Sequence, residues 1–518
     1  MYKKIVKQLT YTTIFITILA LIILTPYLIQ IPEKDETVGG EELKIWMPLD
    51  TYKFSPKIEL TAKLLKHGEI QLTQKNILNL NEKWQIKFLE QQTKKIYIYN
   101  PKLNISTKIL AEPIKILYNG SRKTISQQTI HLIAGENEEV KEIAVIHQIS
   151  IFNKASKQIL TLTDISPGKQ VNKTLQLNLL KTIITKSNLN IIPEKPKIFE
   201  NLKTAYNTYE NQKNITYNLV SINFKNLSTF YMAFWPKPTK IIQYRLTNTK
   251  EEQKIFSVQW TDNLKPNQTK RYITLHGVLD GNKQSKLWKM VNLIFNPTDL
   301  KKAVNQSYDW IVVGREAKID LESAKILNET INAKKIAFDI HNPKNPFTSH
   351  LLHLNQTAGS YHDKFKRLHL TDKIGNFNVS EGKILVVGSV YANKVAEYFN
   401  DFTDSPLTTK NGKTILVVYP SKKPNKFFPV TLNNKGLAVI STCGDLNNTL
   451  CLMVWGYTEK DTYYICKNLE KINIQNLPEG ARTLIIEVNY SHPKEPFKIK
   501  KILGTIIEFN IPNGEKNV

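Results

Sequence analysis

The sequence lacks the short motifs by which several enzyme classes are recognised. Neither G-x-G-x-x-G nor a Walker loop occurs, so a dinucleotide or nucleotide site would lack its phosphate-binding glycines. G-x-S-x-G and H-E-x-x-H are also absent, so neither an α/β-hydrolase nor a zinc protease is indicated. We therefore expect no catalytic residue, no cofactor and no metal, and a protein that is not an enzyme.

Charged residues are missing from Gln8 to Pro32, directly after Lys3, Lys4 and Lys7. The apolar stretch is long enough to cross a hydrocarbon core of about 30 Å. It lacks the small-x-small exit of a cleaved signal peptide, which favours a retained signal anchor over cleavage. Residues 1–32 are therefore predicted to form a transmembrane helix, with the bulk of the chain extracellular at the cell surface.

Acidic residues are fewer than basic ones, 45 against 71, which gives a net charge of +26. Such a balance raises the question of nucleic acid as a partner. The lysines are scattered rather than clustered, however, which is typical of a solvated basic surface. Because the chain is expected outside the cell, we predict no nucleic acid. The predicted partners are the membrane, neighbouring surface subunits and envelope glycans.

Twelve N-x-S/T sequons agree with an exported chain, because such sites accept glycans on secreted proteins. The glycosylation candidates are Asn104, Asn119, Asn172, Asn214, Asn226, Asn267, Asn305, Asn328, Asn355, Asn378, Asn447 and Asn489.

Cysteine is scarce, with three in 518 residues. Cys443 and Cys451 flank GDLNNTL, a turn between two apolar runs, so strand pairing would bring their Cβ atoms within bridging distance. The spacing predicts either a Cys443–Cys451 disulfide or a pair of buried free thiols. Cys466 falls inside a helical pattern, away from the helix start where a thiolate would be stabilised.

Residues 33 to about 300 read as β structure, with short Ile-, Val-, Thr- and Tyr-rich runs separated by turn residues. The segments TDISPGKQVNKTLQLNL and TDNLKPNQTKRYITL look alike. They predict two immunoglobulin-like β-sandwich domains, at 33–195 and 203–300. The Pro- and Lys-rich stretch IIPEKPKIFENLK, at 191–203, is the expected linker.

The pattern changes after Asn305. The runs DWIVVG and KILVVG are each followed by a segment with helical spacing. Strands that alternate with helices predict an α/β domain at 305–475, flavodoxin-like with a mostly parallel sheet and an antiparallel hairpin at 437–456. Terminal β strands follow at 476–518. The predicted fold class is thus multidomain α+β.

Three strands end in a glycine that leads into a helix: Gly314, Gly388 and Gly456. A phosphate cradle needs several glycines so that successive N–H groups can approach the ligand, and each corner supplies one. After the third corner, Thr458 and Asp461 have the spacing of a capping box. We interpret the corners as structural.

Half of the histidines lie within a short region: His341, His350, His353, His362 and His369. His350 and His353 could share a helical face and bind a metal together. The polar, Pro-bearing start of the region favours solvated loop histidines, and a metal site stays open as the alternative.

The glycine corners resemble the αβ segments of archaeal S-layer proteins of the methanogen and Thermococcales type, over about 309–470. The family combines V-V-G-x-x-A-x-x-D, V-V-G-G-P-x-x-N and G-[YW]-T-x-x-D-T. The second motif departs from the family, because Ser389 and Val390 replace Gly-Pro. The matching residues are Gly314, Ala317 and Asp320, then Gly388 and Asn393, then Gly456, Thr458, Asp461 and Thr462.

This resemblance implies a non-enzymatic coat protein with β-sandwich and α/β domains. The predicted function is a structural S-layer or S-layer-associated component of an archaeal envelope, glycosylated and membrane-anchored, in a homo-oligomer or lattice. Two alternatives stay open. One is an accessory or regulatory subunit of an extracellular polysaccharide synthase, and the other is a metal-dependent surface hydrolase that uses the clustered histidines.

Overall fold

The structure is a computed structural model of the whole chain. It describes residues 37–38, 42–47, 60–65, 67–74, 78–90, 93–99, 107–120, 122–136, 139–154, 157–186, 197–199, 208–210, 218–224, 228–246, 253–280, 298–314, 318–331, 336–339, 382–410, 413–418, 428–429, 435–445, 449–504 and 508–509.

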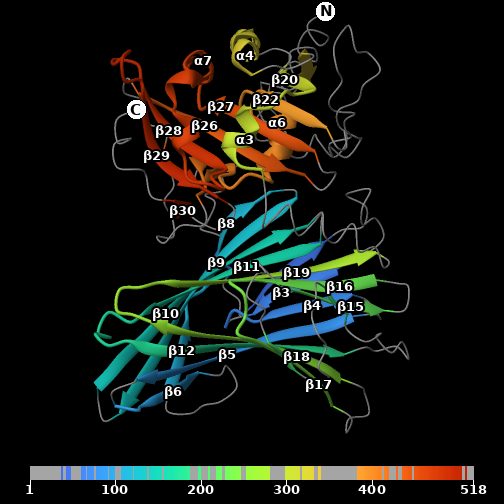
Figure 1. Cartoon of the computed structure of the whole chain (residues 1–518), viewed down its shortest axis with the longest axis vertical. Coiled ribbons are helices and arrows are strands. Elements are labelled where there is room, and N and C mark those ends of the chain that lie inside the picture. The colour runs from blue at the N-terminus through green and yellow to red at the C-terminus, as the bar shows by residue number, and fades with distance from the viewer. Residues whose placement is uncertain are drawn as a thin grey trace, which may run out of the picture.

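The first part of the chain forms two large antiparallel sheets (Figure 1). The ten-stranded sheet has the order β1 (Thr37–Val38), β8 (Ile114–Asn119), β9 (Lys123–Glu136), β10 (Glu139–Asn153), β11 (Gln158–Pro167), β19 (Lys270–Asp280), β16 (Ser228–Trp235), β15 (Asn218–Phe224) and β13 (Lys197–Phe199), with β7 (Thr107–Ala111) also on β9. The nine-stranded sheet has the order β14 (Thr208–Glu210), β17 (Lys240–Leu246), β18 (Gln253–Leu264), β12 (Leu175–Lys186), β5 (Leu78–Glu90), β4 (Ile70–Gln74), β3 (Leu60–Leu65) and β2 (Glu42–Met47), with β6 (Ile96–Tyr99) also on β5.

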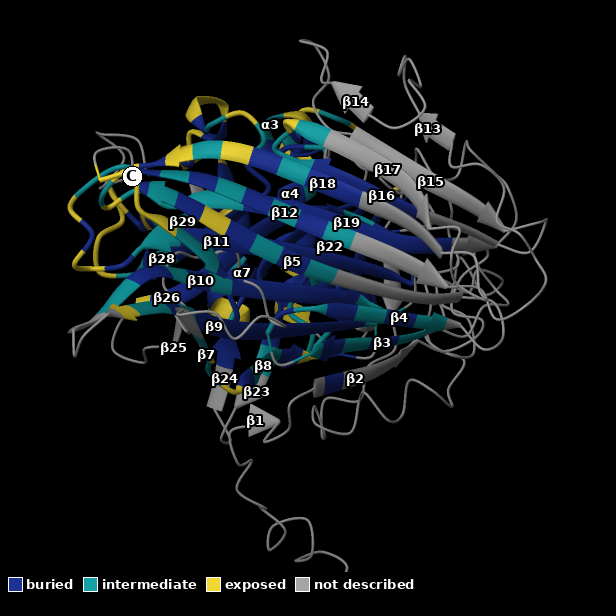
Figure 2. Cartoon of the chain, turned by 90° about the horizontal axis from the view of Figure 1, so that it is seen from below, coloured by how far each residue is buried: buried dark blue, intermediate teal, exposed yellow. Residues whose placement is uncertain are grey.

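One hydrophobic core lies between these sheets. Alternate residues of β12 point inward, so Leu175, Leu177 and Leu179 share it. The buried Trp260 of β18 packs against rings of the other sheet, with its centroid 5.9 Å from that of Phe234 and 5.5 Å from that of Tyr272. Large parts of the strands are buried, as the dark blue segments show (Figure 2).

The prediction of two immunoglobulin-like sandwiches is wrong. β11 pairs with β19, and β12 pairs with β18, so strands from both sides of the expected linker share the same two sheets. Part of that expected linker, Lys197–Phe199, is itself strand β13 and pairs with β15. The two look-alike sequence segments therefore lie side by side in one sandwich.

The second part of the chain is built on an eight-stranded sheet that carries helices. Its order is β21 (Ile336–Asp339), β20 (Trp310–Gly314), β22 (Lys383–Val387), β27 (Leu450–Gly456), β26 (Lys435–Gly444), β28 (Thr483–Asn489), β29 (Phe497–Leu503) and β30 (Glu508–Phe509). The helices are α3 (Leu300–Val304), α4 (Lys318–Thr330), α6 (Lys394–Asn400) and α7 (Glu459–Lys467), with 3-10 turns η2 (Leu469–Lys471) and η3 (Ile474–Asn476). A small sheet joins β23 (Leu407–Lys410), β24 (Lys413–Leu416) and β25 (Phe428–Pro429).

The predicted flavodoxin-like, mostly parallel sheet is also wrong. The pairs from β21 to β27 are parallel, but every pair from β27 to β30 is antiparallel. Both faces of this mixed sheet are buried, since Leu452 and Val454 join one core and Met453 and Trp455 the other. Burial on both faces explains the continuous apolar runs that suggested parallel strands.

The predicted transmembrane helix is not supported, and neither is the prediction that the membrane is a partner through this helix. In the described residues, no helix is long and apolar enough to cross a membrane. Residues 1–32, on which the prediction rests, lie outside the described residues.

Candidate functional site

A row of polar side chains crosses four neighbouring strands of the ten-stranded sheet. Thr129 of β9 is opposite His147 of β10, His147 is opposite Asp164 of β11, and Asp164 is opposite Arg271 of β19. Ile130, on the same strand as Thr129, belongs to the core between the sheets. Because side chains alternate along a strand, the row lies on the outer face.

Arg271 and Asp164 fix one end of the row. The guanidinium donates through Nε to Asp164 Oδ1 and through Nη2 to Oδ2, both at 2.6 Å. The Asp164 side chain is 7% exposed and that of Arg271 is 14% exposed. A bidentate pair of this kind holds both planar groups in one orientation. The carboxylate is therefore a fixed charge beside His147.

His147 occupies the middle of the row and is half-buried. Its Nδ1 lies 3.3 Å from the Thr129 hydroxyl. In the part of the chain that the structure describes, no hydrogen bond joins its Nε2. Burial lowers the pKa of His147, and the nearby Asp164 carboxylate offsets only part of that shift. The imidazole is thus uncharged near neutral pH and presents one nitrogen as an acceptor.

His131 lies two residues beyond Thr129 on the same face and is held by two carboxylates. Its Nδ1 is 2.7 Å from Glu142 Oε1, and its Nε2 is 3.4 Å from Glu112 Oε1. Burial lowers the pKa of His131, but the hydrogen bonds to Glu142 and Glu112 outweigh that effect and raise it above its ordinary value. The charged imidazolium is therefore favoured here.

A β-bulge brings Glu142 to this site. The register between β9 and β10 shifts between Glu142 and Ala144. Ile143 and Ala144 both belong to the inner core, so the extra residue directs Glu142 to the outer face beside His131. The exposed Leu110 of β7, the cross-strand partner of His131, adds an apolar contact at the same edge.

The outer-face row, defined here as Glu112, Thr129, His131, Glu142, His147, Asp164 and Arg271, was missed by the sequence analysis. Its members come from strands that read only as apolar runs, such as IAVIHQIS and LTLTDISP. The available signal is a polar residue at an outward position of each strand. That signal identifies a site only when the register is known, because the register determines which of these residues lie opposite one another.

The three glycine corners lie at the carboxyl ends of adjacent strands β20, β22 and β27. Gly388 has φ +97°, and a Cβ there would lie 2.3 Å from Asp320 Oδ2. Asp320 is 2% exposed, and among the described residues its Oδ1 has no hydrogen-bond partner. Burial raises the pKa of Asp320 to about 7, with a further contribution from Glu459, while a bond from Thr462 opposes the shift. The structure thus brings together residues from all three glycine-corner segments.

The helix after Gly456 begins with Thr458 as its N-cap. The Thr458 hydroxyl accepts from the Asp461 N–H at 3.2 Å, and the Asp461 carboxylate accepts from the Thr458 N–H at 2.9 Å. Close packing occupies this corner, since a Cβ on Gly456 would lie 2.4 Å from the backbone nitrogen of Thr462. The corner is therefore closely packed around a helix start that caps itself.

Cys443 and Cys451 are directly opposite in the β26–β27 pair, and both are buried free thiols. Six sequons are described. Asn119, Asn172, Asn267 and Asn305 are exposed, and Asn328 and Asn489 are partly exposed. The sequons at Asn104, Asn214, Asn226, Asn355, Asn378 and Asn447, and the histidines from His341 to His369, lie outside the described residues.

No family model matches this chain, and no curated protein does. The Slr1438 protein of Synechocystis sp. PCC 6803 is 8% identical, with 46% of this chain and 96% of that chain covered, at a TM-score of 0.31. A galactose mutarotase related enzyme from Lactobacillus acidophilus is 10% identical, with coverages of 46% and 100% and a TM-score of 0.29. A GH36 alpha-galactosidase from Geobacillus stearothermophilus is 7% identical, with coverages of 57% and 50% and a TM-score of 0.29. None of these three is named as an S-layer protein.

Proposed function

We propose that this protein binds a polyhydroxylated ligand, such as an envelope glycan, on the outer-face row. The observation that carries the proposal is the pre-arrangement of the row, in which His131, Asp164 and Arg271 are each fixed by a second charged side chain. Polar groups that are held in place before binding lose little conformational entropy when a ligand binds.

The row offers the hydrogen-bonding groups that hydroxyls require. One ring nitrogen of the neutral His147 and the partly exposed carboxylates of Glu112 and Glu142 accept, and the Thr129 hydroxyl can donate or accept. The exposed Leu110 side chain provides an apolar contact for a sugar face. Positive and negative side chains are paired within the row, which favours a neutral ligand over a strongly charged one.

Titration calorimetry with neutral oligosaccharides tests this proposal on the full chain. We expect measurable binding by the wild type and at least a tenfold weaker affinity in His147→Ala. His492→Ala removes an exposed histidine far from the row in sequence and is the matched control, with unchanged affinity expected. Equal affinity in all three proteins would show that the row is not the binding site.

A second candidate function is proton-transfer catalysis on the bound ligand. The specific observation is that the pKa of His131 is raised while that of His147 is lowered, because such a divergence assigns one group as acid and the other as base. NMR spectra of the oligosaccharide after incubation with the protein would distinguish the two functions. Conversion that is lost in His147→Ala supports catalysis, and an unchanged ligand supports binding alone.

The cell-surface location and the S-layer role rest on the sequence alone and stay predictions. A glycan ligand is consistent with both predictions. It is also consistent with an accessory role beside a polysaccharide synthase. Electron microscopy of isolated envelopes with this protein labelled separates the roles, since a periodic array favours a coat and sparse labelling favours an accessory subunit.

A further inference from the structure

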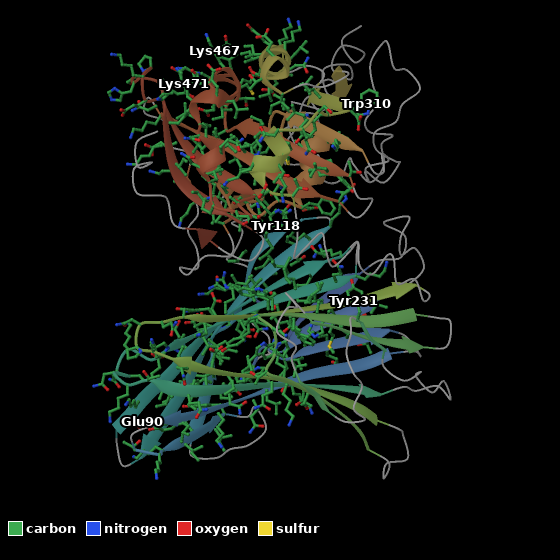
Figure 3. The ribbon with its side chains drawn as sticks, in the orientation of Figure 1. Glu90, Tyr118, Tyr231, Trp310, Lys467 and Lys471 are labelled. Atoms are coloured by element: carbon green, nitrogen blue, oxygen red, sulfur yellow. The ribbon has the colours of Figure 1, made fainter. Side chains whose placement is uncertain are left out.

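The turn between β8 and β9 is bonded to the turn that follows α6 in the second part of the chain. The Tyr118 hydroxyl donates to Asp401 Oδ1 at 2.7 Å, and the Arg122 N–H donates to Asp401 Oδ2 at 3.0 Å. Lys123 Nζ donates to the carbonyl of Thr403 at 3.1 Å. Tyr118 lies where the sandwich meets the eight-stranded unit (Figure 3). We call this contact the joint.

The joint buries several charges together. Lys123 is 4% exposed, and Asp401, Asp404 and Arg482 are buried with it. Arg482 Nη1 lies 3.9 Å from Asp404 Oδ1, and Arg122 Nη1 lies 3.9 Å from Asp401 Oδ2. The titratable and charged groups that face one another here come from β8, the β8–β9 turn, β9, the β10–β11 turn, α6 and its following turn, β26 and the residue before β28. They are Tyr118, Arg122, Lys123, Lys154, Glu397, Asp401, Asp404, Cys443 and Arg482.

The joint has little room to relax around these charges. A Cβ on Gly120 would lie 2.2 Å from Asp401 Oδ1, so the backbone of the β8–β9 turn approaches the carboxylate closely. Asn400 holds the same tyrosine from the other side, because its Nδ2 donates to the Tyr118 oxygen at 3.1 Å. A buried set of this kind specifies geometry more than it adds stability, since each ion loses its hydration on docking.

We propose that the joint is proton-linked, so that the sandwich and the eight-stranded unit dock more firmly when Lys123 gives up its proton. A neutral amine keeps two N–H bonds and can still donate to the Thr403 carbonyl. Deprotonation therefore removes the buried charge and preserves the hydrogen bond that aligns the two units.

The direction follows from the environment of Lys123. Burial lowers its pKa to about 8 although Asp401 and Asp404 oppose the shift. The docked state thus releases a proton more readily than an undocked state in which the lysine is hydrated, at its ordinary value of 10.5. Docking should gain strength as pH rises from about 8 toward 10.5. The docked-to-undocked ratio then increases roughly 25-fold between about pH 7 and about pH 9.5.

Three other groups in the joint titrate as well. Burial lowers the pKa of Lys154 and Asp401 opposes that shift, so this lysine adds a smaller change of the same sign as Lys123. The other two act outside this window or in the opposite direction. Burial raises the pKa of Asp404, so its contribution to docking is present in acid and is lost as pH rises through that raised value. Burial and the Asp401 carboxylate also raise the pKa of Tyr118 well above its ordinary value. The tyrosine therefore stays neutral in the docked state throughout the experiment.

Energy transfer between dyes on the two units tests the proposal in the full chain. The exposed Lys94 and Lys498 are replaced by cysteine for labelling, since the native cysteines are buried. The urea concentration is adjusted so that the docked and the separated states are both measurably populated at neutral pH. We expect the docked fraction of the wild type to rise with pH, by the ratio given above.

Lys123→Arg keeps a positive charge at every pH used, so it should lose most of the change in docked fraction between the two pH values. The small change that remains comes from Lys154, whose pKa burial also lowers. Lys87→Met removes an exposed lysine of the sandwich and should behave as wild type. If Lys123→Arg fails to fold, Lys123→Met is compared with its matched control Lys87→Met. The same loss of pH dependence is expected in Lys123→Met and not in Lys87→Met. A wild type without pH dependence, or a Lys123 variant that keeps the full wild-type change, would overturn the proposal.

Discussion

Asp320 provides the sharpest quantitative prediction, because it is a buried carboxyl whose Oδ1 has no hydrogen-bond partner in the described part of the chain. Its pKa rises from 3.8 to about 7, and a shift of roughly three units corresponds to about 4 kcal/mol. The positive end of the α4 dipole favours the carboxylate and reduces this by up to about 1 kcal/mol. The expected cost of the charged form is thus about 3 kcal/mol.

The sign follows from the raised pKa. A group of this kind contributes stability that is fully present below 3.8 and is lost as pH rises through about 7. Asn imitates the neutral acid in shape, so Asp320→Asn should match the wild type near pH 4. Near pH 8 the variant should be more stable than the wild type by about 3 kcal/mol, since only the wild type then carries the buried charge.

Hydrogen exchange followed by mass spectrometry measures this effect in the right part of the chain. Amides of β27 report on the eight-stranded unit separately from the sandwich. Glu470→Gln, on an exposed carboxylate, is the matched control and should equal the wild type at every pH. A stability difference between Asp320→Asn and wild type that is the same at both pH values would refute the reasoning.

Three further substitutions test the packing of both units, each by urea unfolding with hydrogen exchange to locate the change. Gly388→Ala should lose about 1–3 kcal/mol, because φ is +97° and the new Cβ would meet Asp320; unchanged stability would exclude the close contact. Thr458→Ala should lose about 1 kcal/mol of stability, because the N-cap hydrogen bond is missing. Thr458→Asn should show no gain in stability over the wild type. Trp260→Ala should lose about 3–5 kcal/mol in the sandwich, and a much smaller loss would mean a loosely packed core.

Local structure could be predicted well where one segment determines it. The strand that ends at Gly314, the helix that begins at Glu459 and the hairpin that pairs Cys443 with Cys451 all lie where the sequence pattern places them. Each depends on contacts between residues that are close in sequence: apolar runs, a cap and a tight turn.

Strand pairing could not be predicted, because alternation determines which face of a strand is buried but not its neighbour. The segments TDISPGKQ and TDNLKPNQ resemble each other because both form corners between the same two sheets. A repeated pattern was interpreted as two domains, although one sandwich with paired corners produces it equally well. The lysine-rich stretch between them looked like a linker, although three of its residues form a strand.

The outer-face row shows the same limit at the level of function. His147 acquires its neighbours from Thr129 and Asp164 on different strands, and Glu142 reaches His131 only because of a bulge. None of these residues is close enough to its partners in sequence to form a motif. The motifs that are visible in the sequence mark the glycine corners instead. Gly388, for example, packs closely against Asp320. In this chain the conspicuous sequence motifs mark structural corners, whereas the polar groups of the proposed ligand site come from apolar strands that carry no motif.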